Sequence, residues 1–286
     1  MRYSFVILHY MAPGVTRCCV YSILNAFRNA DISIVVVDNA SPDGSGAVLK
    51  QEFAQIGKVH FVMLEENAGF ARGNNAGYRF AVENLGPDFV IVLNNDVIVA
   101  DLGFLDKIAA QYESDPFAVL GPDIYFPLED RHQSPTRLVP MTLDVAESLR
   151  KKIARKMRHF FYNYTTWNIK LALWLKKAPA PVDQDTANPH EGCVLQGACY
   201  IFSRDFISKR QDAFNPATFL YLEEDILELE CRRQGLKMRY TPELKVMHLE
   251  DASTRAAFSS EYRRYRMKGQ RMLESLGIFI DMLRNE

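Results

Sequence analysis

The first 100 residues alternate between short apolar runs and longer amphipathic segments. The apolar runs are five or six residues long and rich in Val, Ile or Phe: Tyr3–Leu8, Ile32–Val37, Val59–Leu64 and Phe89–Leu93. Between them the pattern predicts helices over Val15–Arg28, Gly44–Ile56 and Ala68–Asn84. Buried strands that alternate with helices are typical of an α/β fold with a mostly parallel sheet and right-handed crossovers. Ligands bind in such folds beyond the carboxyl ends of the strands.

The alternation changes after residue 100. Residues 129–190 contain five prolines and no strand–helix alternation, so we interpret them as an insertion. The tail, Ser259–Leu283, is predicted to be an amphipathic helix. The other elements predicted here are a helix over Leu102–Glu113, strands at Phe117–Leu120, Ile124–Phe126 and Cys199–Phe202, a helix near Leu222–Gln234, and strands at Lys237–Tyr240 and Leu244–His248.

Composition excludes some classes of protein. Of the 286 residues, 48% are hydrophobic and 24% charged, which excludes a disordered chain. The net charge of -1 argues against a broad nucleic-acid-binding surface. The five cysteines show no paired framework, and the N-terminal apolar run is too short for a signal peptide. We therefore expect a cytoplasmic protein, with the inner face of the cell membrane as a candidate location.

Three polar clusters follow predicted strands. His9-Tyr10 follows the first strand, Asp38-Asn39-Ala40-Ser41 the second, and Asn94-Asn95-Asp96 the fourth. Asp38 is placed to bind donor groups of a ligand, although a helix-capping turn would use the same residues. Asn94 and Asp96 offer the oxygen ligands that Mg²⁺ or Mn²⁺ prefers beside a diphosphate, whereas the structural alternative is an Asx turn.

Two further segments contain candidate functional residues. Glu66–Gly77 places three glycines and three asparagines, among them Asn67 and Asn75, around Arg72 at a strand-to-helix turn. Small residues there allow close approach of an anionic ligand, or simply close packing on the sheet. The second segment, Phe219–Leu227, contains three consecutive acids that could equally be a solvated helix cap: Glu223, Glu224 and Asp225.

In their order along the chain, these segments resemble the inverting glycosyltransferases of family 2, which have the GT-A fold. The resemblance rests on Val35–Ser45, Glu66–Gly77, Val90–Asp96 and Phe219–His248, the last with its Gly235, Pro242 and His248. It implies one domain over 1–286, divided into a nucleotide-sugar-binding half (1–128), a basic and aromatic insertion (129–190), an acceptor and catalytic half (191–252) and a helical tail (253–286).

The resemblance also implies roles for individual residues. Asp38 corresponds to the acid that binds the nucleotide base, and Asp96 to the ligand of a metal that bridges the diphosphate, with His248 as a second ligand. Asn94 replaces the first acid of the family's DxD motif. Glu224 aligns with the catalytic base, Asp225 is the second choice, and Glu223 adjoins them. The remaining candidates for binding the nucleotide sugar are His9, Tyr10, Asn67, Arg72, Asn75, Asn95 and Gly197.

The segment Arg150–Lys177 contains nine Lys and Arg and no Asp or Glu, interleaved with aromatic and aliphatic residues that include Trp167 and Trp174. This composition is typical of a helix that lies on a membrane surface. A basic helix packed on the catalytic domain, or a contact between copies, would have the same composition. Nucleic acid is disfavoured because no recognised binding module accompanies the segment.

The sequence predicts an enzyme that transfers a sugar from a UDP- or dTDP-sugar to a glycan or lipid-linked acceptor, for example a rhamnosyl or galactosyl residue in the synthesis of surface polysaccharides. One alternative is a non-catalytic relative that binds sugar nucleotides or organises a membrane complex. The presence of Asp96 and of the acids at 223–225 disfavours it. A nucleotidyltransferase is disfavoured because residues 9–14 do not form a Gly-rich loop with a basic residue.

Overall fold

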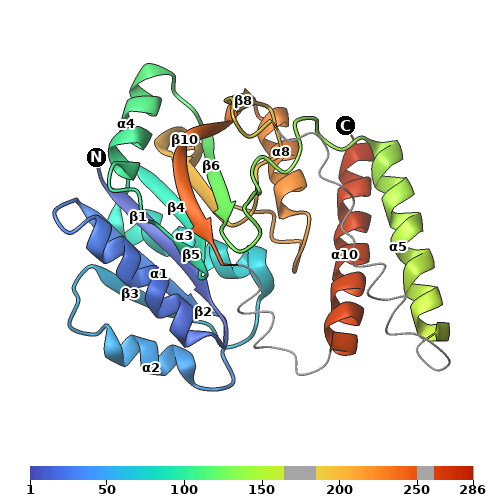
Figure 1. Ribbon diagram of the computed structural model, residues 1–286, viewed down its shortest axis with the longest axis horizontal. Helices are drawn as coiled ribbons and strands as arrows, with labels where there is room; N and C mark the ends of the chain where they lie inside the picture. Colours follow the sequence, from blue (N-terminus) through green and yellow to red (C-terminus); the bar gives the residue numbers. More distant parts are fainter. Residues whose placement is uncertain (164–184, 250–260, 286) are drawn as a thin grey trace.

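The computed structural model describes residues 1–163, 185–249 and 261–285 (Figure 1). Its first half follows the predicted alternation closely, with one strand or helix for each predicted segment. Each strand begins at the predicted residue, and the element ends differ by a few residues. The elements are β1 (Tyr3–His9), α1 (Pro13–Ala26), β2 (Ile32–Asp38), α2 (Ser45–Glu52), β3 (Val59–Met63), α3 (Gly69–Leu85) and β4 (Phe89–Asn94).

The second half adds short elements that the apolar pattern does not predict, among them three two-residue strands and a one-turn helix. In chain order the elements are β5 (Val97–Ile98), α4 (Phe104–Ser114), β6 (Val119–Phe126), β7 (Arg131–His132), α5 (Leu143–Asn163), β8 (His190–Glu191), β9 (Cys199–Ser203), α7 (Arg204–Ile207), α8 (Glu223–Arg233), β10 (Met238–His248) and α10 (Glu261–Arg284).

One mixed sheet organises the molecule, with strands in the order β3-β2-β1-β4-β9-β6-β10-β5. The first four strands are parallel, β9 is antiparallel to both of its neighbours, and β6 and β10 are parallel to each other. The predicted α/β fold with a mostly parallel sheet is therefore confirmed. The antiparallel strands are β9 and the two-residue strands β5, β7 and β8.

Helices cover both faces of this sheet because alternate residues of each strand face opposite cores. On β1, Phe5 and Ile7 pack with α1, α2 and α4, whereas Val6 packs with α3 and α8. The same alternation occurs on β2 and β4. Burial on both faces explains why these strands are continuous apolar runs rather than alternating ones.

The structure corrects two of the predicted breaks. Gly121 and Pro122 do not separate two strands but lie within β6, paired with Tyr240 and Thr241 of β10. Gly121 is needed there because a Cβ atom would lie 2.5 Å from the Leu195 side chain. The strands predicted at 237–240 and 244–248 are likewise one strand, and Pro242 lies in its register shift, where a missing amide is tolerated.

A separate layer of helices adjoins the sheet. α5 and α10 lie side by side at the right of Figure 1, and their apolar sides form a small core with α8. Ala146 of α5, Ile226 of α8 and Phe279 of α10 are buried in it. The predicted C-terminal helix is confirmed by α10. Of the predicted basic segment, 150–163 belongs to α5, whereas 164–177, with Trp167 and Trp174, lies outside the described residues.

Candidate active site at the carboxyl edge of the sheet

The ends of β1 and β2 place Asp38 at the carboxyl edge of the sheet. His9 and Asp38 are register partners, and the Asp38 carboxylate is buried and accepts the Ser41 N–H at 3.3 Å. A Cβ atom on Gly46, in the first turn of α2, would lie 2.2 Å from Asp38 Cγ. Glycine therefore allows the start of α2 to pass directly over this acid.

His9 lies behind this edge rather than on it. Its side chain is fully buried, with Nδ1 2.8 Å from Thr16 Oγ1 and Nε2 2.9 Å from Ser45 Oγ. Asn95 is also buried and donates to Thr16 Oγ1 at 2.9 Å. These side chains connect β1, α1, α2 and the end of β4, whereas Tyr10, the next residue after His9, is half-buried.

The turn before α3 is held by Asn39, a member of the predicted polar cluster after the second strand. Asn39, directly after Asp38, accepts the Ala68 N–H at 2.8 Å and donates to Asn67 Oδ1 at 3.1 Å. Asn67 Oδ1 also accepts the Gly69 N–H at 3.0 Å, so these side chains replace the missing hydrogen bonds at the helix start. Asn67 itself is exposed.

α3 is fastened to the loop that precedes the acidic helix. Gly69 has a φ of +79°, and a Cβ atom there would lie 2.3 Å from the Phe219 carbonyl oxygen. Arg72 is exposed and donates from Nε to the Pro216 carbonyl at 2.9 Å. Asn75 is fully buried and exchanges two hydrogen bonds with the Phe214 backbone, at 2.7 and 2.9 Å. Asn75 therefore joins two parts of the chain, and its amide groups face the protein.

Asp96 and His248 meet at the edge formed by β4, β5 and β10. His248 Nε2 lies 3.2 Å from Asp96 Oδ1, and both side chains are buried. His248 Nδ1 donates to Gln133 Oε1 at 2.8 Å, which leaves Nε2 facing the carboxylate. In a neutral ring Nε2 then presents a lone pair, and a nitrogen and an oxygen that converge in this way are suitable ligands for a divalent cation.

The described residues contain no cluster of three or more His, Cys, Asp and Glu side chains that could hold a metal. A cation between Asp96 and His248 would therefore take its other ligands from a bound diphosphate or from water, as is common for Mg²⁺. Asn94 ends β4 half-buried, and its backbone N–H donates to the Ala198 carbonyl at 2.9 Å. This bond ties the end of β4 to the loop around Gly197.

The three acids begin α8 and have different surroundings. Glu223 is buried, and burial, with the neighbouring charge of Glu224, raises the pKa of its carboxyl to about 8. Asp225 is also buried and forms an ion pair with Arg137; burial raises its pKa and the arginine opposes that rise. Glu224 is half-buried, and burial raises its pKa as well.

The Glu224 carboxylate packs against Gly197. A Cβ atom on Gly197 would lie 2.7 Å from Glu224 Oε1, and a hydrogen bond from the Gly197 backbone favours the charged form of this acid. Tyr200 Oη, Arg137 Nε and Glu223 Oε1 are buried without a hydrogen-bond partner among the described residues. Unsatisfied buried polar groups are rare in proteins, and three of the eight such atoms in the described residues lie at this acidic cluster.

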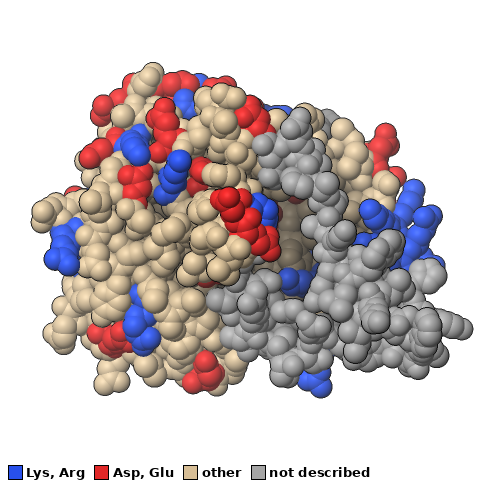
Figure 2. All heavy atoms as spheres, in the orientation of Figure 1, with Lys and Arg blue, Asp and Glu red and all other residues tan. Residues whose placement is uncertain are grey.

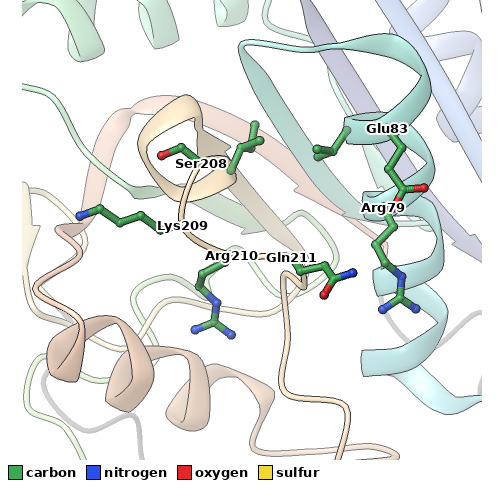
Figure 3. Close-up of a pocket in the computed structure, with 8 residues that line it drawn as sticks. Arg79, Glu83, Ser208, Lys209, Arg210 and Gln211 are labelled. Carbon is green, nitrogen blue, oxygen red and sulfur yellow. The ribbon is translucent and has the colours of Figure 1, made fainter.

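A pocket on another part of the surface contains none of the predicted site residues. It lies between the second half of α3 and the segment after α7, and Figure 3 shows Arg79, Glu83 and Arg210 among its lining residues. Arg79 pairs with Asp212 at 2.5 Å and Arg210 with Glu230 at 2.6 Å. Both cations therefore have acidic partners already, and neither was predicted to take part in a functional site.

A comparison with protein-family models agrees with this arrangement. Residues 4–171, more than half of the chain, match the model of glycosyl transferase family 2. The chain belongs to this family. The matched residues include Asp38 and Asp96, whereas the acids at 223–225 lie beyond the match.

Relatives of this family 2 glycosyltransferase are distant. The dTDP-rhamnosyl transferase RfbF of Shigella flexneri is 25% identical over 114 residues, which are 40% of this chain and 36% of that protein. Residues 1–349 of S. aureus TarS superpose with a TM-score of 0.53 at 13% identity, covering 87% of this chain and 60% of that one. The structure of GalNAc-T7 with UDP, GalNAc and Mn²⁺ superposes with a TM-score of 0.57 at 14% identity. The match covers 86% of this chain and 43% of that one.

These matches support the GT-A fold, and the chain spans 36%, 60% and 43% of the length of these three relatives. Within the site, sequence analysis missed Gln133 and Arg137. It named Asn39 as part of the polar cluster after the second strand but gave it no role of its own. Gln133 and Arg137 lie in the proline-containing insertion, and nothing in their local sequence indicates a role in the site.

Proposed function

We propose that this protein is a metal-dependent, inverting glycosyltransferase. Its donor is a UDP- or dTDP-sugar, and its acceptor is a glycan or a lipid-linked sugar of a surface polysaccharide. The observation that carries the proposal is the contact between Asp96 and His248 beside the loop that contains Gly197. Gly197 in turn packs against the Glu224 carboxylate. The similarity to a dTDP-rhamnosyl transferase favours dTDP-rhamnose among the donors.

The chain's own groups account for the steps of such a transfer. Asp38 would bind the nucleotide base, and Asp96 with His248 would hold Mg²⁺ or Mn²⁺ at the diphosphate. The cation, when bound, stabilises the negative charge of the leaving diphosphate. Glu224 takes the proton of the acceptor hydroxyl. The oxygen of that hydroxyl attacks the anomeric carbon of the donor sugar from the face opposite the diphosphate. One displacement inverts the anomeric centre, so a covalent nucleophile is not needed.

Glu224 is a better candidate for the base than Asp225. The Asp225 carboxylate is engaged by Arg137, whereas Glu224 is half-buried beside the Gly197 backbone. Burial raises the pKa of Glu224, and a carboxylate with a raised pKa accepts a proton more readily. Glu223, with a pKa raised to about 8, is mostly protonated at neutral pH and is therefore a poor base there.

The decisive experiment measures thermal stabilisation by dTDP-rhamnose, UDP-galactose and their free nucleotides, with and without Mn²⁺. A ligand that binds only the folded protein raises the melting temperature by mass action. We expect one nucleotide to stabilise the protein in a Mn²⁺-dependent manner, and Asp96→Ala to abolish that dependence. His248→Ala should weaken it less. Asp31→Ala removes an exposed acid at the opposite end of the sheet and serves as the control.

If Asp96→Ala retains the full Mn²⁺-dependent stabilisation, the metal assignment is wrong. Stabilisation by a sugar nucleotide, combined with no transfer to any polysaccharide precursor and no release of nucleoside diphosphate, would favour a non-catalytic relative that only binds the nucleotide.

A further inference from the structure

Two basic segments that are far apart in the sequence form one end of the helical layer. Residues 150–163 contain six Lys and Arg and no acid, and residues 262–273 contain five and no acid. The first segment belongs to α5 and the second to α10. Neither segment by itself indicates that the other lies beside it.

Close contacts establish that the two helices are antiparallel neighbours. A Cβ atom on Gly269 of α10 would lie 2.2 Å from the Met157 sulfur of α5, and one on Gly277 would lie 3.9 Å from the Arg150 guanidinium. At the other end Arg284 pairs with Glu147 at 2.7 Å. The second half of α5 therefore lies against the first half of α10, so the two basic segments are side by side in space (Figure 1).

The charged side chains lie on the face of α5 opposite its core. Ala146, Leu149, Ile153 and Met157 recur at helical spacing and face the shared core or α10. Lys151, Lys152, Arg155 and Arg158 recur on the other side and are exposed. On α10 the exposed cations of the same end are Arg263 and Arg266. Figure 2 shows Lys and Arg side chains gathered over the outer flank of α5.

This basic surface is joined directly to the acidic cluster. Arg271 of α10 stacks on the Phe219 ring, with its guanidinium carbon 4.1 Å from the ring centre. Ser275 donates to the Leu220 carbonyl at 2.9 Å. Leu222, which precedes the acids of α8, is buried against α10. If this end of the helical layer bound to a surface, these contacts would hold α8 and its acids at a defined distance from that surface.

We propose that the exposed basic residues of α5 and α10 together form a docking surface for an anionic lipid membrane. No helix among the described residues is long and apolar enough to cross a bilayer, so the proposed contact is peripheral. Each Lys or Arg near an anionic leaflet contributes about 1 kcal/mol. Exposed cations on two neighbouring antiparallel helices complement the charge of an anionic surface. The whole chain has a net charge of -1, so acids elsewhere in the sequence balance this positive charge.

The inference goes beyond the proposed function, because docking does not depend on the sugar transferred. It also differs from docking through the insertion alone, since α10 must contribute. Two double variants separate these possibilities: Lys151→Gln with Arg155→Gln on α5, and Arg263→Gln with Arg266→Gln on α10. Arg28→Gln with Lys50→Gln removes two exposed cations from the first half of the chain and is the matched control.

The experiment is sedimentation of the full chain with vesicles of phosphatidylcholine, with or without roughly one-third phosphatidylglycerol. We expect binding only to the anionic vesicles, and release when the salt is raised from about 0.05 M to about 0.5 M, because exposed charges are screened. Each of the two double variants should lower the partition coefficient by about thirtyfold, the factor for two residues at the contribution given above. The control pair should leave it unchanged.

Three results would overturn the proposal. The first is equal, negligible pelleting with both kinds of vesicle. The second is binding that the α5 pair abolishes and the α10 pair does not affect, which would restrict the surface to α5. The third is salt-sensitive binding of a single-stranded RNA oligonucleotide without binding to vesicles. Nucleotide-dependent thermal stabilisation, measured on the same variants without vesicles, shows whether the active site is intact independently of docking.

Discussion

Three neighbouring acids on one helix turn have different protonation behaviour because their surroundings differ. Glu223 is buried with one oxygen unpartnered within the described chain, Asp225 has Arg137, and Glu224 has the Gly197 backbone and partial access to solvent. A solvated helix cap would be exposed at all three positions. The burial of Glu223 and Asp225 therefore argues against the purely capping interpretation of this cluster.

Replacing Glu224 by Gln should lower the transfer rate by about 10²–10⁴-fold while donor binding is retained, because the amide cannot accept the acceptor's proton. In the wild type, kcat/KM should fall as the pH drops through the raised pKa of Glu224, above the ordinary Glu value of about 4.3. Glu113→Gln, an exposed change on α4, is the control. If Asp225→Asn is inactive and Glu224→Gln is active, the base is Asp225.

Glu223 should make the folded state less stable as the pH rises. In the unfolded chain its carboxyl ionises near the ordinary Glu value, whereas in the folded protein its pKa is about 8. Between these two values only the unfolded state releases the proton, so the free energy of unfolding decreases with pH and levels off above about 8. Glu223→Gln should therefore raise the melting temperature more at pH 8 than at pH 5. An equal shift at both pH values would contradict a buried, protonated Glu223.

Among the elements, one short segment of the insertion connects the two chemical parts of the site. Gln133 accepts from His248, and Arg137 pairs with Asp225. The Gln133 N–H donates to the Ile124 carbonyl at 2.8 Å, and Arg137 is bridged to Val194. Residues 133–137 are thus held between β6 and the segment that leads to Gly197. They contact His248 and Asp225 without belonging to any of the sequence motifs that suggested the family.

Gln133→Leu should weaken Mn²⁺ binding by about 10–100-fold, because the hydrogen bond that orients a metal-ligating histidine is lost. The measurement is the Mn²⁺ concentration that gives half of the nucleotide-dependent thermal stabilisation. Gln133→Glu retains an acceptor for His248 Nδ1 and should recover most of the affinity. A uniform loss of stability in both variants, with the Mn²⁺ midpoint unchanged, would show that Gln133 has only a structural role.

In the whole molecule, contacts between α3 and residues 210–219 hold the two halves of the domain together. Asn75, Arg72 and Arg79 each bond across this boundary, to Phe214, Pro216 and Asp212. Because both cores also share one sheet, we expect the halves 1–128 and 191–252 to unfold in a single transition. The candidate active site lies across this boundary, so its geometry depends on the same contacts.

Asn75→Ala should lower the free energy of unfolding by about 1–3 kcal/mol, because two buried backbone groups of Phe214 lose their partner. The affinity for the nucleotide, measured well below the melting temperature, should not change. Asn84→Ala, an exposed position on the same helix, is the control. Weaker nucleotide binding at unchanged stability would instead place Asn75 in the donor site, as its sequence motif suggests.

Local pattern by itself determined most of the first half of this protein. Apolar runs such as Val35–Val37, bounded by polar turns, predict buried strands because both faces of a central strand are covered. Chain order and right-handed crossovers then bring Asp38 and Asp96 to one edge. The ordered motifs were enough to predict the family, and the sequence alone singled out the acids at 223–225 as candidate catalytic residues.

Only the tertiary structure decided which distant residues became partners. His248 and Gln133 are 115 residues apart, and no local periodicity specifies their hydrogen bond. Long-range packing also places antiparallel β9 between β4 and β6. It likewise brings α5 and α10 together, with their basic segments side by side. A local pattern records which side of an element is apolar. Which element covers that side depends on the free energy of burying both together.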